Sequence, residues 1–81
     1  MRRESFPIAN IYVPVKMRTT LKQETVDALA ASILQDGLRD PILVRRDGER
    51  FVLVEGLHRL EACKALGETT IAGYLVQTRK H

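Results

Sequence analysis

The sequence predicts a small α/β (α+β) domain of the order β-α-β-β-α-β, with a mixed sheet and two helices. Three observations lead to this prediction. Two segments carry apolar residues at helical spacing, short runs of β-branched and aromatic residues lie around them, and glycine or proline marks most boundaries. A chain of 81 residues suits one domain, 1–81, with a core at about residues 8–77.

The first elements are a strand, a connector and a helix. The segment Ile8–Val13 is rich in β-forming residues and lies between two prolines, which predicts an edge strand because proline cannot donate to a sheet. Residues 15–20 are expected to form a basic connector. A helix then opens at Thr20 or Leu21, since Thr20 and Gln23 have the form of a capping box. Its apolar stripe consists of Val26, Leu29, Ala30, Ile33 and Leu34.

The middle of the chain predicts a hairpin. Gly37 is suited to end the first helix, and Pro41 prevents its continuation. Ile42–Val44 is then expected as a short buried strand, with Phe51–Val54 as its returning partner. Asp47–Gly48 is a strong indicator of the tight turn that joins them.

The last elements follow Gly56, which interrupts the strand pattern. Residues 57–66 are expected to form the second helix, and Gly67 to cap its end. The β-branched residues of Thr69–Val76 predict a final strand, and the basic tail 77–81 is expected to fray.

The composition excludes several classes of protein. The single cysteine, Cys63, excludes an internal disulfide and a cysteine-rich zinc site. No apolar run approaches the roughly 20 residues that span a bilayer, and no signal-peptide pattern follows the polar N-terminus. We therefore expect a cytoplasmic protein without a membrane partner. The net charge of +3 and the pI near 9.4 are compatible with a nucleotide or nucleic-acid partner.

The segment with the most chemical information is the turn Glu55-Gly56-Leu57-His58-Arg59, where a strand ends and a helix begins. The first amides of a helix lack internal partners and the helix dipole adds positive potential, so an anion is favoured there. Gly56 allows a ligand to approach the backbone, Arg59 offers a planar fork for phosphate oxygens, and His58 can donate a hydrogen bond. This arrangement predicts a phosphate-binding turn. An ordinary turn with solvated His58 and Arg59 is the alternative.

Three blocks of the chain also match a known pattern. Residues 29–44 read L-x-x-S-I-x-x-x-G-x-x-x-P-I-x-V, residues 54–62 contain G-x-x-R-x-x-A, and residues 66–71 read L-G-x-x-x-I. In this order they resemble the ParB/sulfiredoxin-like family, also called the ParB-like N-terminal or ParB-like nuclease domain. The resemblance implies that fold, and a nucleotide, CTP or ATP, whose phosphates lie on Gly56, His58 and Arg59.

Position 57 distinguishes the activities within this family. Sulfiredoxins have their reactive cysteine there and CTP-hydrolysing partition proteins have a glutamate, so Leu57 argues against both chemistries. Cys63 lies nearly two helical turns further on and cannot replace the cysteine. We expect Cys63 to be an inert core thiol, because apolar burial raises the pKa of a thiol. Whether the chain is an enzyme stays open.

Four further residues are candidates for the site. Glu55 resembles the acidic residue of D-G-H-H-R members, which include serine-kinase relatives, and could act as a base or Mg²⁺ ligand. Arg18 occupies a basic position that faces the nucleotide in the family. Ser32 lies where some members present a hydroxyl to the nucleotide, and Arg39 could reach the same cleft. The alternatives are an ion pair for Glu55, a packed small residue for Ser32 and solvated arginines.

These expectations define three hypotheses. The first is a nucleotide-phosphate-binding domain of a bacterial-type plasmid or chromosome partition protein, or of another DNA-associated regulator. The second is a small ATP-dependent phosphotransferase or nuclease of the same fold, and the third is a catalytically dead interaction domain. The first is compatible with a homodimer and with DNA bound through its phosphates. Three arginines of the hairpin could touch such phosphates or be solvated turn residues: Arg45, Arg46 and Arg50.

Overall fold

A mixed five-stranded sheet forms one layer of the computed structural model, which describes residues 2–77. In sheet order the strands are β1 (Arg3–Pro7), β5 (Thr70–Val76), β3 (Ile42–Asp47), β4 (Arg50–Glu55) and β2 (Ile11–Tyr12). The β1–β5 and β3–β4 pairs are antiparallel, whereas β3 pairs in parallel with β5 and β2 with β4. The predicted fold class, with its mixed sheet, is therefore confirmed.

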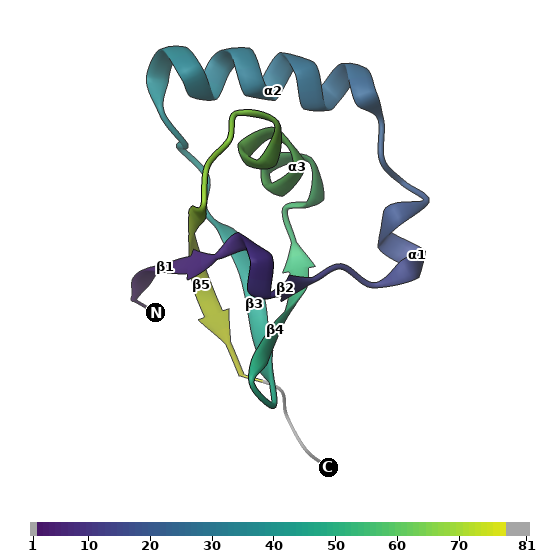
Figure 1. The fold of residues 1–81 in the computed structure, drawn as a ribbon, viewed down its shortest axis with the longest axis vertical. Helices are drawn as coiled ribbons and strands as arrows, with labels where there is room; N and C mark the ends of the chain where they lie inside the picture. Colours follow the sequence, from purple (N-terminus) through teal and green to yellow (C-terminus); the bar gives the residue numbers. More distant parts are fainter. Residues whose placement is uncertain (1, 78–81) are drawn as a thin grey trace.

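As Figure 1 shows, helix α3 (Leu57–Ala65) lies between the sheet and a second helix, α2 (Gln23–Asp36). Helix α3 packs its buried side chains into the core formed by the strands, and α2 lies across α3. A third, short helix, α1 (Val15–Arg18), connects β2 to α2. Within residues 2–77, none of the helices is long and apolar enough to cross a membrane.

The N-terminal strand differs from the prediction. Residues 3–7 form β1, Ile8–Asn10 form a 3₁₀ turn, and Ile11–Tyr12 alone pair with β4. The chain bends within this segment, because Pro7 ends β1 and the Ile8 amide donates to the Thr69 carbonyl at 3.0 Å. The β-forming residues of the segment therefore do not form one continuous strand. Burial, and not strand pairing, accounts for their apolar character.

The connector and the start of α2 also differ from the prediction. The connector contains α1, whose first turn begins after Pro14, with the Met17 amide donating to the Pro14 carbonyl at 3.0 Å. Thr20 forms no capping box, since its hydroxyl donates to the Met17 carbonyl at 2.7 Å and closes this turn instead. Helix α2 begins at Gln23, after Lys22, which provides no side-chain cap.

The apolar stripe of α2 is narrower than predicted. Val26 is buried and three further residues of the stripe are partly buried, but Leu34 is 77% exposed. Because α2 packs on a single helix, α3, only residues at i, i+3, i+4 and i+7 from Val26 reach the contact. At the end of α2, Gly37 has a φ of +80° and its amide donates to the Ile33 carbonyl at 2.7 Å, as expected for the cap.

The hairpin and the C-terminal half follow the predicted order of elements, although β3 continues to Asp47, three residues past its predicted end. The two-residue loop is Gly48–Glu49, one residue later than expected, because Asp47 still pairs with Arg50. Helix α3 and strand β5 lie within one residue of their predicted bounds. Most of the tail expected to fray, 78–81, lies outside the described residues. Aliphatic side chains fill the centre of the core, led by the fully buried Ile42, Leu53, Leu60 and Val44.

Candidate functional site

Gly56 forms the turn between β4 and α3 in a left-handed conformation, with φ +110° and ψ +32°. A Cβ atom at this position would lie 2.7 Å from Cγ2 of Ile42, so backbone conformation and packing both require glycine. The helix begins at the next residue, and the Leu60 amide donates to the Gly56 carbonyl at 2.9 Å. No side chain caps this N-terminus, so the first amides of α3 are available to an anion.

Leu57 lies in the first turn of α3 and points inward. Its side chain is 6% exposed and belongs to the main core cluster. An aliphatic side chain held this way supplies neither a nucleophile nor a carboxylate. Its contribution to the predicted turn is therefore a backbone amide and an apolar wall.

His58 makes a contact that the sequence did not indicate. Its Nε2 atom accepts a hydrogen bond from the Lys22 amide at 3.1 Å, which ties the first turn of α3 to the residue preceding α2. An accepting Nε2 atom requires the neutral imidazole with its proton on Nδ1. His58 can donate to a phosphate through Nδ1, or through Nε2 after exchanging this contact.

Arg59 faces the loop before β3 and is 30% exposed. Its Nη2 atom lies 3.8 Å from Oδ2 of Asp40, a counter-ion that the sequence analysis did not include. Ser32 and Arg39 meet Arg59 and Asp40 around a small hollow of about 100 Å³. Three of the predicted site residues therefore come together here, although they are far apart in the sequence.

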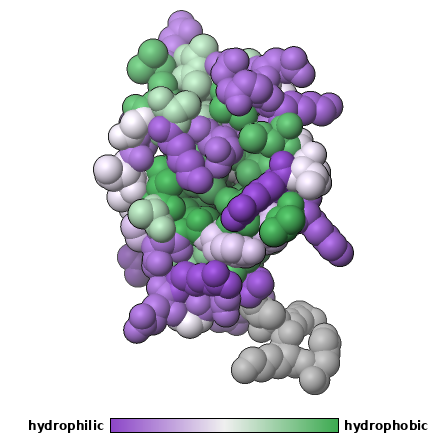
Figure 2. Space-filling model, turned by 45° about the vertical axis from the view of Figure 1, so that its right-hand side comes forward, coloured by the Kyte–Doolittle hydropathy of each residue, from purple (hydrophilic) through white to green (hydrophobic). Residues whose placement is uncertain are grey.

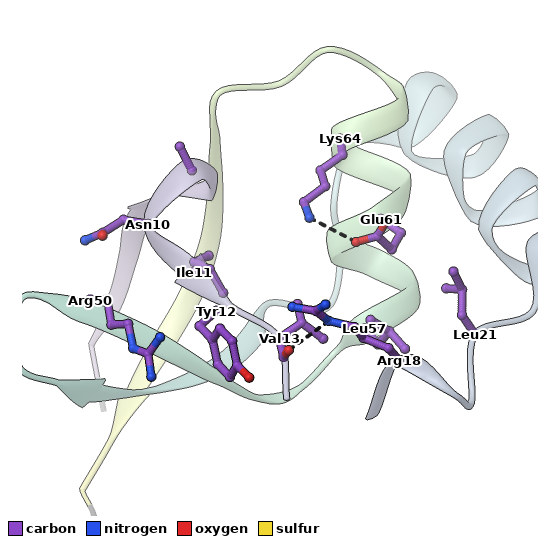
Figure 3. A pocket seen from close by; sticks show the side chains of 11 residues that line it. Asn10, Ile11, Tyr12, Val13, Arg18, Leu21, Arg50, Leu57, Glu61 and Lys64 are labelled. Atoms are coloured by element: carbon purple, nitrogen blue, oxygen red, sulfur yellow. Dashed lines mark hydrogen bonds and ion pairs between the residues drawn. The ribbon is translucent and has the colours of Figure 1, made fainter. Parts of the chain in front are cut away.

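A larger hollow of about 560 Å³ lies between the β2 segment and α3 (Figure 3). Arg18 projects into it and is held in place, because its Nε atom donates to the Val13 carbonyl at 3.0 Å. The guanidinium of Arg18 lies 5.6 Å from the Tyr12 ring centroid, and that of Arg50 lies 4.3 Å from the same centroid. Arg50 is also paired with Asp47 at 3.1 Å.

The face that carries α1 combines apolar and charged surface. Figure 2 shows apolar side chains gathered at its centre with hydrophilic side chains around and partly across them. The larger hollow has the same mixed character, with Leu57 and Leu21 beside the charged Arg18, Arg50 and Lys64. Mixed linings of this kind suit ligands with an apolar part and an anionic part.

Three residues of the larger hollow were not predicted from the sequence: Tyr12, Glu61 and Lys64. Glu61 and Lys64 follow Leu57 at i+4 and i+7, the spacing of one helical face, so this pattern could have identified them. Tyr12 offered no comparable pattern, because its place beside Arg50 depends on the pairing of β2 with β4.

Glu55 occupies a different environment from the other candidates. It is the last residue of β4, is exposed and pairs in register with Leu43. It lines neither of the two hollows described above. Its role as a base or Mg²⁺ ligand stays a prediction.

The remaining candidates have structural surroundings of their own. Cys63 is 3% exposed, as expected of a core thiol, and burial followed by the nearby Glu68 carboxylate raises its pKa. In the hairpin, the Arg46 guanidinium lies 5.2 Å from the Phe51 ring centroid. Arg46 and Arg50 are exposed, and each guanidinium lies over an aromatic ring.

The fold and the site together define a class: a small α+β domain whose glycine turn opens the N-terminus of a helix beside basic side chains. Within this class, the chain belongs to the ParB N-terminal domain family, whose model matches residues 3–81. The resemblance noted in the sequence is thereby confirmed.

Partition proteins are among the relatives of the chain. It is 40% identical over 62 residues to the "Probable chromosome-partitioning protein ParB" of Campylobacter jejuni, covering 76% of this chain and 22% of that protein. It is 35% identical over 71 residues to the "Probable plasmid-partitioning protein ParB" of Xylella fastidiosa, covering 85% and 18%. The chain thus spans about a fifth of the length of these curated relatives.

Solved structures of the same fold include two functional types. Sulfiredoxin from Arabidopsis thaliana superposes with a TM-score of 0.86 at 29% identity, over 96% of this chain and 88% of that one. The truncated chromosome-partitioning protein ParB from Caulobacter crescentus, complexed with CTP-gamma-S, superposes with a TM-score of 0.84 at 25% identity. That match covers 99% of this chain and 47% of the other.

Proposed function

We propose that the chain is a nucleotide-binding domain of a partition-type protein, and that it binds the phosphates of CTP or ATP at the Gly56–Arg59 turn. The observation that carries this proposal is the turn at Gly56, where a left-handed glycine packed against Ile42 leads directly into α3. No side chain caps this helix, so its first amides are available to a ligand. Amides and dipole at this end favour an anion, and Arg59 adds a charged donor. The Caulobacter ParB complex with CTP-gamma-S supports a nucleotide as the ligand.

The larger hollow gives the rest of the nucleotide a place. Its volume of about 560 Å³ lies within the roughly 300–1,000 Å³ of typical ligand pockets. Leu57 forms a wall at the turn, and Arg18 is held over the hollow by its hydrogen bond to Val13. In this proposal Arg18 contacts the phosphate chain from the side opposite α3.

The smaller hollow lies on the other side of the same turn. Ser32 and Arg39 line it together with Arg59. A phosphate that reaches Arg59 from the turn would compete with Asp40 for the guanidinium. We propose that Ser32 and Arg39 support Arg59 or contact a terminal phosphate oxygen.

The proposed activity is binding without rapid turnover. Hydrolysis needs a group that activates water at the reacting phosphate, and Leu57 does not provide one. One Caulobacter ParB structure is complexed to the centromeric parS site. For this chain, contact with DNA phosphates and homodimer formation are proposals.

Calorimetric titration with CTP, ATP and GTP, each with Mg²⁺ and with EDTA, tests the proposal. One nucleotide is expected to bind with a dissociation constant in the micromolar range, corresponding to about −8 kcal/mol. Inorganic tripolyphosphate is expected to compete with that nucleotide, since both would use the turn. If no nucleotide and no tripolyphosphate bind under either condition, the third hypothesis, an interaction domain with a dead site, replaces this proposal.

A further inference from the structure

Glu61 is the one carboxylate among the described residues that line the larger hollow. Its side chain is 28% exposed, and its Oε2 atom lies 3.1 Å from Nζ of Lys64 (Figure 3). Arg18, from α1, and Arg50, from β4, line the same hollow. A single carboxylate therefore sits in a hollow that is otherwise lined by cationic, neutral polar and apolar side chains.

The helix places this carboxylate on the face that begins at the phosphate turn. Glu61 follows Leu57 by four residues, which places it one turn further along the same face, about 6 Å along the axis. Side chains on an α-helix tilt toward its N-terminus, so Glu61 covers the turn that precedes its own Cα atom. Lys64 reaches the carboxylate from the C-terminal side, as Figure 3 shows.

A carboxylate in this place creates an electrostatic conflict once phosphates bind to the turn. Two negatively charged groups would face each other unless a cation lies between them. Lys64 provides that cation in the free protein. A magnesium ion would provide it in the complex, because Mg²⁺ is commonly held by one or two carboxylates together with substrate phosphates and several waters.

We propose that Glu61 is the protein ligand for Mg²⁺ in a bound magnesium–nucleotide complex, and that Lys64 is its counter-ion in the absence of the metal. The inference rests on the proposed function, since the phosphates complete the metal site. Residues 2–77 contain no group of three or more His, Cys, Asp or Glu side chains that could hold a metal by themselves. Mg²⁺ alone is therefore expected to bind weakly.

Glu55 is the competing candidate for this ligand, so comparing its variant with that of Glu61 tests which of the two glutamates holds the metal. Both are glutamates close to the turn, but Glu55 is exposed at the end of β4 and lies outside the larger hollow. Replacing either side chain with glutamine removes one negative charge and nearly preserves the shape. Only the replacement in the hollow is expected to change the dependence on the metal.

The test is a calorimetric comparison of wild type, Glu61→Gln and Glu55→Gln, each titrated with the nucleotide in Mg²⁺ and in EDTA. Wild type and Glu55→Gln are expected to bind about tenfold or more tightly in Mg²⁺ than in EDTA. Glu61→Gln is expected to bind equally in the two conditions, at or above the metal-free affinity of wild type. A second readout, on wild type, is paramagnetic broadening by Mn²⁺ in the nucleotide complex. Broadening is expected to be strongest for the Glu61 side chain.

The outcomes separate the inference from the function on which it rests. Absence of nucleotide binding to wild type in both Mg²⁺ and EDTA overturns the proposed function. Binding that does not depend on Mg²⁺, or a Glu61→Gln variant that keeps the wild-type dependence, overturns only the inference. The inference also fails if Glu61→Gln lowers affinity equally in both conditions, or if Mn²⁺ broadens Glu55 rather than Glu61. If Glu61→Gln fails to fold, the Mn²⁺ measurement on wild type decides.

Discussion

At the scale of single residues, replacing Arg59 is expected to lower nucleotide affinity without lowering the stability of the fold. Its guanidinium is partly exposed, and its partner Asp40 lies largely in solvent, at 3.8 Å. Arg59→Ala is expected to weaken nucleotide binding by roughly tenfold to a hundredfold, because charge-assisted hydrogen bonds contribute about 1.5–3 kcal/mol. The melting temperature should hold or rise slightly, since a cation leaves the positive end of α3. Calorimetry and thermal unfolding measure the two effects.

The control for this prediction is Arg46→Ala. Arg46 carries the same charge but stacks on Phe51 in the hairpin and lines neither of the hollows beside the turn. Its replacement should leave nucleotide affinity within about twofold of wild type. Equal losses in the two variants would mean that the ligand responds to net charge and not to the turn. Unfolding of Arg59→Ala would instead identify Arg59 as a structural residue.

Gly56 makes a second prediction at this scale, concerning stability. Alanine there would be strained at φ +110° and would place its Cβ atom 2.7 Å from Cγ2 of Ile42. Ile42 is fully buried, so its side chain has no free space in which to move away. Gly56→Ala is therefore expected to lower the free energy of unfolding by about 2–5 kcal/mol. Gly48→Ala is the matched control, because Gly48 has a φ of +62° with no atom within 4 Å of the added Cβ. It should cost only about 1–2 kcal/mol in urea denaturation.

At the scale of elements, the sequence predicted the helices and strands that are determined by interactions within one segment of the chain. The hairpin, α3 and β5 follow from turn residues and periodicity that lie within each segment. β1 could not be recognised, because four of its five residues are exposed and Phe6 alone is buried. Its strand conformation comes from pairing with β5, which lies more than 60 residues away in the sequence. The same limit applies to the site, where the turn was visible but Tyr12 beside Arg50 was not.

The link between α2 and α3 leads to a prediction about elements. The Lys22 amide donates to Nε2 of His58 at 3.1 Å, so His58→Ala removes the acceptor of a bond that fixes the start of α2. Hydrogen exchange at the Lys22 amide should then accelerate about fivefold or more, as expected for the loss of about 1 kcal/mol. The Leu60 amide, which donates to Gly56 within α3, should exchange as in wild type. Acceleration at both amides would point to general loosening of α3 instead.

At the scale of the whole molecule, Cys63 reports on the core as a unit. Its thiol is 3% exposed and packs in the cluster that joins α3 to the sheet. A thiol-reactive reagent should therefore modify it only after the domain opens, at a rate that follows global unfolding. Urea below the unfolding midpoint should accelerate the reaction in proportion to the unfolded population. Rapid modification of the native protein would show that Cys63 becomes accessible without global unfolding, and would contradict this prediction.

The same thiol makes stability depend on pH. Burial, and secondarily the Glu68 carboxylate, raises the pKa of Cys63 in the folded state. Above the ordinary thiol pKa of about 8.5, the unfolded chain releases this proton while the folded chain retains it. The free energy of unfolding should therefore be unaffected by this group below that pH, and should fall as pH rises through the folded-state pKa. Urea denaturation of wild type and Cys63→Ala across this range isolates the effect, because the alanine variant lacks the thiol's contribution to the slope. Identical slopes would show that the thiol titrates alike in both states.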